Sequence, residues 1–98
     1  MLFKQHGDIK AWRDSNGAHT NVPHAIVHHS PTGMEWGYGG SGPADFALNI
    51  LYLFTDRETA FNLHQEFKRE FVATMPREGG EIKANIIRDW IYSKTAKL

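Results

Sequence analysis

The segment with the clearest chemical potential is rich in glycine and leads into a predicted helix. A single serine stands among the glycines and a proline follows, in the order Gly39-Gly40-Ser41-Gly42-Pro43. Glycines let a backbone approach a ligand closely, and the free N–H groups of a first helical turn can hold a phosphate. One hypothesis is therefore a phosphate or nucleotide site. The alternative is a tight strand-to-helix connection in which Ser41 or Gly42 caps the helix.

The same glycines resemble the sharp turn that presents a serine nucleophile in some hydrolases. Pro43 occupies the position of the last glycine of that turn, and no pattern places an acidic partner beside His28 or His29. No Lys-Ser or Lys-Thr pair follows the glycines, so the segment is not a P-loop. A hydrolase is therefore the remotest alternative, and the sequence assigns no catalytic residue.

Five of the six histidines lie within the first 29 residues, which suggests a metal site. His24 and His28 are four residues apart, but Ala25-Ile26-Val27 between them favours a strand, which would separate the two by about 13 Å. Ligands of one zinc ion lie about 2 Å from it. The sequence therefore predicts no metal site and no cofactor. His29 is expected to hydrogen-bond the turn at Ser30-Pro31 instead.

Large and small residues alternate in Met34-Glu35-Trp36-Gly37-Tyr38, which predicts a strand over residues 34–38. Glu35 would be a general acid or an acceptor for the N–H groups of the glycine segment. Trp36 and Tyr38 are typical packing residues, and in exposed positions they would stack on a base or anchor a partner. The candidate ligand- or partner-binding residues are His29, Ser30, Glu35, Trp36, Tyr38, Gly39, Gly40, Ser41 and Gly42.

The elements that must position these residues divide the chain into two halves. In the first half, residues 9–13 and 25–28 have strand character, and Asn16-Gly17 indicates a hairpin with a type I′ turn. In the second half, apolar residues three and four apart predict helices over residues 43–54, 56–75 and 83–93.

Helix boundaries are indicated by known signals. Pro43 suits the first helical position, and Thr55 and Glu58 have the spacing of a capping box. Gly79-Gly80 is expected to lead into the third helix. The predicted core stripes include Phe67, Phe71, Ile86 and Trp90. We therefore expect an α+β fold, a small antiparallel sheet with about three helices packed on one side, in a single domain over residues 1–98.

Composition limits the classes of function. A chain of 98 residues supports one modest core, and the absence of cysteine excludes disulfides and thiol catalysis. Eleven basic residues balance eleven acidic ones, and both signs alternate along the predicted helices, so nucleic acid is a poor candidate partner without being excluded. The most apolar run, residues 46–54, is far below the roughly 20 residues that cross a bilayer. We expect no membrane partner and a cytoplasmic location in a bacterial host.

Residues 29–44 read His-Ser-Pro-Thr-Gly-Met-Glu-Trp-Gly-Tyr-Gly-Gly-Ser-Gly-Pro-Ala. This segment resembles the signature of a family of small proteins of unknown function from bacteria and their phages, with Met34 where that signature has Phe. The resemblance extends over roughly residues 25–92. It implies a single domain and a phage or prophage context, and it implies no catalytic residue.

Two hypotheses follow. The first is a non-enzymatic phage or prophage accessory protein that docks onto a protein partner, one version being an inhibitor of a host defence. The second is a phosphate- or nucleotide-binding site at the glycine segment. A pocket with N–H groups converging from Gly40 to Ala44 would favour the ligand, and a flat exposed patch of aromatic side chains would favour the partner.

Overall fold

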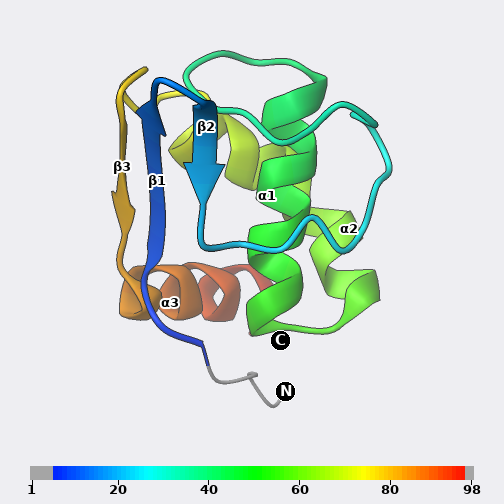
Figure 1. Cartoon of the computed structure of the whole chain (residues 1–98). Coiled ribbons are helices and arrows are strands. Elements are labelled where there is room, and N and C mark those ends of the chain that lie inside the picture. Colours follow the sequence, from blue (N-terminus) through cyan, green and yellow to red (C-terminus); the bar gives the residue numbers. More distant parts are fainter. Residues whose placement is uncertain (1–5, 97–98) are drawn as a thin grey trace.

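The computed structural model describes residues 6–96 and has the predicted α+β fold. In Figure 1 a three-stranded sheet lies on one side of the central helix α1 and helix α2 lies on the other. In chain order the elements are β1 (Ile9–Asp14), β2 (Gly17–Thr20), α1 (Ser41–Phe54), α2 (Arg57–Phe67), the π-helical turn η1 (Lys68–Val72), β3 (Gly79–Ile82) and α3 (Ala84–Thr95).

The sheet is antiparallel with the order β2-β1-β3. On the central strand, Ile9 and Ala11 are buried while Lys10 and Trp12 are exposed. This alternation gives the sheet one face toward the helices and one face toward solvent.

The sequence pattern predicts no third strand, since it has Gly79-Gly80 lead directly into the third helix. Gly79 has a φ of +120°, and a Cβ atom added there would lie 2.1 Å from the carbonyl oxygen of Ala11. Glycine is therefore required for β3 to approach β1 this closely. Two adjacent glycines lack the side chains from which a strand is recognised.

The β1–β2 hairpin is confirmed, but its turn type was predicted wrongly. Asp14 pairs with Gly17, so Ser15 and Asn16 form the turn. Gly17 has a φ of +116°, and no non-glycine residue among those described has a positive φ. Because a type I′ turn requires positive φ at both central residues, Asn16-Gly17 does not form one.

Helix α1 is the centre of the fold, with residues 42–51 all buried. It begins at Ser41, two residues before the predicted start, and Gly40 is its N-cap without a side-chain hydrogen bond. The expected cap at Ser41 or Gly42 is therefore wrong. Pro43 is the third helical residue, where its missing N–H is tolerated because the first N–H groups of a helix lack intrahelical partners.

Helix α2 also departs from the prediction at both ends. Its N-cap is Asp56, whose carboxylate accepts the Thr59 N–H at 2.7 Å, so the predicted cap at Thr55 is one residue too early. The α-helix ends at Phe67, and the next turn widens to π geometry. The predicted single helix over residues 56–75 is therefore an α-helix followed by a π-helical turn, and the turn ends at Val72.

The aromatic core of the helical half is largely as predicted. Phe67 and Trp90 are buried and Phe71 is half-buried, and the rings of Phe67 and Phe71 stack 4.7 Å apart. Ile86 is 45% exposed, so its assignment to the core was wrong. The buried face of α3 is formed by Ile87, Trp90 and Ile91, and Ile86 lies one position around the helix from it.

Residues 21–40 cross over α1 without regular secondary structure, as the cyan segment in Figure 1 shows. The strands predicted over residues 25–28 and 34–38 are therefore wrong. Within residues 6–96, no helix is both long and apolar enough to cross a membrane.

Candidate functional site

A side chain of α1 takes the place of a neighbouring strand beside residues 25–28. The Asn49 amide accepts the Ile26 N–H at 2.8 Å and donates to the Ile26 carbonyl at 2.8 Å. It also donates to the Asp45 carbonyl one turn earlier on the helix. Because Asn49 satisfies both backbone groups of Ile26, this segment needs no strand partner.

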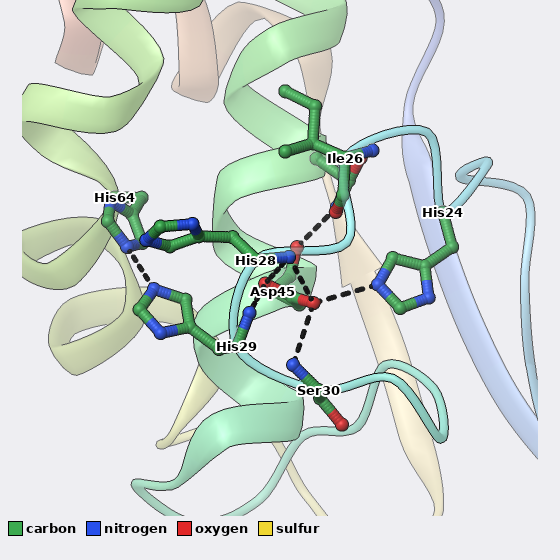
Figure 2. A network of polar contacts seen from close by, with 8 residues as sticks. His24, Ile26, His28, His29, Ser30, Asp45 and His64 are labelled. Atoms are coloured by element: carbon green, nitrogen blue, oxygen red, sulfur yellow. Dashed lines mark hydrogen bonds and ion pairs between the residues drawn. The ribbon is translucent and has the colours of Figure 1, made fainter.

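The carboxylate of Asp45, one turn before Asn49, holds the next part of the same segment (Figure 2). It is fully buried and accepts backbone N–H groups from His29 at 2.8 Å, Ser30 at 3.0 Å and His28 at 3.2 Å. The His24 Nε2 lies 2.9 Å from its second oxygen. Residues 24–30 are thus fixed to α1 by one charged group with four donors.

These donors decide the protonation of Asp45. Burial alone would raise the pKa of the carboxyl, but the hydrogen bonds from His24 and from three backbone N–H groups lower it below its ordinary value. Asp45 is therefore ionised at neutral pH. Since a carboxylate only accepts hydrogen bonds, Nε2 of His24 carries the proton, and in neutral His24 the Nδ1 atom holds a lone pair.

His29 turns toward α2 rather than toward the Ser30-Pro31 turn, which corrects the expectation for it. Its Nε2 lies 2.8 Å from Nε2 of His64, and Nδ1 of His64 donates to the Phe61 carbonyl at 2.7 Å. Burial lowers the pKa of His64, with the nearby His29 and His28 adding to the effect. His64 is therefore neutral and accepts the hydrogen bond from His29.

The spacing of this histidine pair is that of a hydrogen bond. Two ligands of one tetrahedral zinc ion lie about 3.3 Å apart, given bonds of about 2.0–2.1 Å, whereas these nitrogens are 2.8 Å apart. In the part of the chain that the structure describes, no three His, Asp or Glu side chains are arranged to hold a metal ion.

A second charged network holds residues 34–38. Arg13 of β1 donates to both carboxylate oxygens of Glu35, at 2.7 and 3.2 Å, and its guanidinium lies 4.4 Å from the ring centroid of Trp36. Trp36 is 1% exposed, and its indole N–H donates to the Arg77 carbonyl. The hydrogen bonds from Arg13 lower the pKa of Glu35. Glu35 therefore pairs with Arg13, which corrects its predicted role as the acceptor for the glycine segment.

The glycines of residues 37–42 are needed mainly because a larger residue would collide with neighbouring side chains. Unusual backbone angles are the smaller reason. Of Gly37, Gly39, Gly40 and Gly42, Gly37 alone has a positive φ. A Cβ atom on Gly42 would lie 2.8 Å from Cβ of Glu35, and one on Gly40 would lie 2.7 Å from the ring of Tyr38. Few N–H groups converge here, because proline at position 43 has none and the Ala44 N–H bonds the Gly40 carbonyl.

Residues from both networks line one pocket of about 520 Å³ between β2, residues 30–38 and the start of α1. They are His24, Ser30, Glu35 and Trp36. Five of the candidate residues line it: Ser30, Glu35, Trp36, Tyr38 and Gly42. His29 lies behind it against His64, and Ser41 is exposed at the helix start. The complete lining is Ala18, His19, Thr20, Val22, His24, Ser30, Thr32, Gly33, Met34, Glu35, Trp36, Tyr38 and Gly42.

The sequence analysis did not identify the residues that fix this pocket. Asp45 and Asn49 carried a usable signal, since two polar residues one turn apart interrupt an otherwise apolar helix. Arg13 and His64 carried none, because their partners are 22 and 35 residues away. Trp36 packs in the core, which is the first of the two roles expected for it. Tyr38 is 53% exposed, which leaves it free for the second role, stacking on a base or anchoring a partner.

Comparison with known proteins places the whole described fold within one family. The model of a family of unknown function, DUF6166, matches residues 4–93, which include both networks and the pocket. No curated protein and no solved structure matches the chain. The protein belongs to the DUF6166 family.

Proposed function

We propose that this protein is a non-enzymatic binding protein that recognises a protein partner over the mouth of the pocket. One observation carries the proposal: Tyr38 is 53% exposed at a pocket that the protein's own side chains hold open. Exposed tyrosines beside a pocket are frequent anchors of protein interfaces. The exposed Gly39 and Ser41 next to it leave room for a partner's backbone.

The pairing of the charged groups supports binding over catalysis. His24 is held by Asp45, Glu35 by Arg13, and His19 by the Asp14 carboxylate at 2.8 Å. Each pair fixes the position of a lining residue. The hydrolase alternative would need a histidine on Ser41, but His29, one of its two candidate bases, bonds His64.

The phosphate alternative has less support at the start of α1. The Glu35 side chain lies against Gly42, so an anion at the first helical turn would meet a carboxylate. No lysine or arginine lines the described pocket. The same lack of cations gives little support to nucleic acid as the partner.

The biological setting belongs to the same proposal and rests on the resemblance of residues 29–44. It is that of a phage or prophage accessory protein in the cytoplasm of a bacterial host, with inhibition of a host defence as one version. A protein of this size acts by occupying a surface of its partner, for which a preformed pocket and one aromatic anchor suffice.

Affinity capture from infected host cells tests the proposal, followed by a binding measurement with the purified partner. We expect Tyr38→Ala to weaken that binding by at least about tenfold. Tyr92→Ala is the matched control, because Tyr92 is 64% exposed on α3 and does not line the pocket. Equal affinity of the Tyr38 variant and the wild type would contradict the proposal.

A further inference from the structure

One residue of the pocket lining, Ser30, has a hydroxyl group that the protein itself does not bond. Ser30 is 8% exposed, and its N–H donates to Asp45. Figure 2 shows its hydroxyl oxygen pointing away from that carboxylate. Within residues 6–96 no group hydrogen-bonds this hydroxyl, and Ser30 lines the pocket. No buried side-chain oxygen among the described residues lacks a partner, so this hydroxyl is open to water and is available to a ligand in the pocket.

Other lining groups have free hydrogen-bonding capacity as well. Nδ1 of His24 and the hydroxyls of Thr32 and Tyr38 have no partner among the described residues. Because Asp45 accepts from Nε2 of His24, the Nδ1 atom is left for a ligand. The lining residues therefore include three hydroxyls and one imidazole nitrogen without a protein partner.

The charges of the pocket select against anions. Glu35 is the one acidic residue in the described lining, and its partner Arg13 lies outside that lining. A negatively charged ligand would find no lysine or arginine there and would approach the Glu35 carboxylate. An uncharged polar ligand meets neither penalty.

The volume and shape complete the argument. About 520 Å³ lies within the usual range of small-ligand pockets, and the exposed Tyr38 ring at its mouth offers a face for stacking. We propose that the pocket binds an uncharged, ring-shaped small molecule with hydroxyl or amide groups, the chemistry shared by nucleosides and sugars, and that it rejects phosphorylated forms. The ligand would lie inside the pocket over whose mouth the proposed protein partner binds, and its binding is tested without that partner.

Calorimetric titration of the purified protein with the common nucleosides, their 5′-monophosphates and the common monosaccharides tests the inference. We expect saturable binding of a nucleoside or a sugar, and the class that binds identifies the source of the ligand. For a nucleoside, the monophosphate should bind at least about tenfold more weakly. Tighter binding of the monophosphate, or no binding of any nucleoside or sugar at millimolar concentration, would overturn the inference.

Two substitutions make the test specific. Ser30→Ala should weaken ligand binding by about tenfold without lowering the melting temperature, because the hydroxyl has no protein partner. Ser15→Ala, in the exposed hairpin turn, is the control. Thr32→Lys should improve binding of the monophosphate by adding a cation to the lining. An unchanged affinity in Ser30→Ala would refute the inference, while partner capture through Tyr38 would be unaffected.

Discussion

The two networks that enclose the pocket perform the same task in different environments. On one side, Asp45 is fully buried and holds residues 24–30 mostly through backbone N–H groups. On the other, Arg13 and Glu35 are 22% and 35% exposed and hold residues 34–38 through a side-chain pair. In both cases polar side chains hold a segment for which the sequence pattern predicts a strand.

The difference in burial determines what each network contributes. Removing a buried charge leaves its donors unpaired and shielded from water, whereas a partly exposed pair is screened and is replaced by water. We infer that Asp45 contributes mainly to stability and that the Arg13–Glu35 pair mainly sets the shape of the pocket.

The largest expected effect separates the two networks directly. Asp45→Ala leaves three backbone N–H groups and His24 without their acceptor, so it should reduce the free energy of unfolding by about 3–5 kcal/mol. Glu35→Ala should cost at most about 1 kcal/mol. Urea denaturation measures both. Asp14→Ala, at an exposed carboxylate, is the control, and equal losses at positions 45 and 35 would contradict the comparison.

A smaller effect is expected for the glycines next to the second network. Gly42→Ala places a Cβ 2.8 Å from Cβ of Glu35, which has little freedom to move, so we expect a loss of about 1–2 kcal/mol despite better helix propensity. Gly40→Ala meets only the exposed Tyr38 ring, and Gly40 has a φ of −146°. It should therefore change the unfolding free energy by less than about 0.5 kcal/mol.

These stability measurements also test whether the glycines are required by neighbouring side chains or by the backbone conformation. If Gly40→Ala were the more damaging substitution, the glycine segment would have to be constrained by its backbone rather than by its neighbours. Thermal unfolding of both variants, followed by circular dichroism, distinguishes the two explanations.

The smallest expected effect is a dependence of stability on pH, which we assign to the buried His64. Burial lowers the pKa of His64, so its neutral form is favoured by folding, and stability should fall as the pH drops below the unfolded value of about 6.5. The pKa values of Asp45 and Glu35 are also lowered, so their contributions are lost only in stronger acid. The melting temperature should be lower at pH 5.5 than at pH 7.5, and His64→Gln should reduce this difference.

Fold class, the hairpin and three helices were predictable from the sequence because they depend on local periodicity and turn residues. The strands at 25–28 and 34–38 were not, because the contacts that hold these segments, from Asn49 to the Ile26 backbone and from Arg13 to the Glu35 carboxylate, come from distant parts of the chain. Strand β3 was missed because its close approach to β1 requires glycine, a residue that otherwise indicates a loop.

The pocket was half predictable for the same reason. Five of its lining residues were predicted as candidates within residues 29–44, since the composition of that segment is unusual in itself. The contacts of Asp45, His24 and Arg13 that fix the pocket span 15 to 22 residues of chain, so no local pattern shows which residues they join.

The central claim is that Asp45 holds one side of the pocket in place before anything binds. Amide hydrogen exchange of the free protein, resolved by residue with NMR, tests it most directly. The His29 and Ser30 amides, which donate to Asp45, should exchange nearly as slowly as the amides of α1. The amides of Tyr38 and Gly39, which have no partner within residues 6–96, should exchange rapidly. Exchange of His29 and Ser30 as fast as that of Tyr38 and Gly39 would contradict the account.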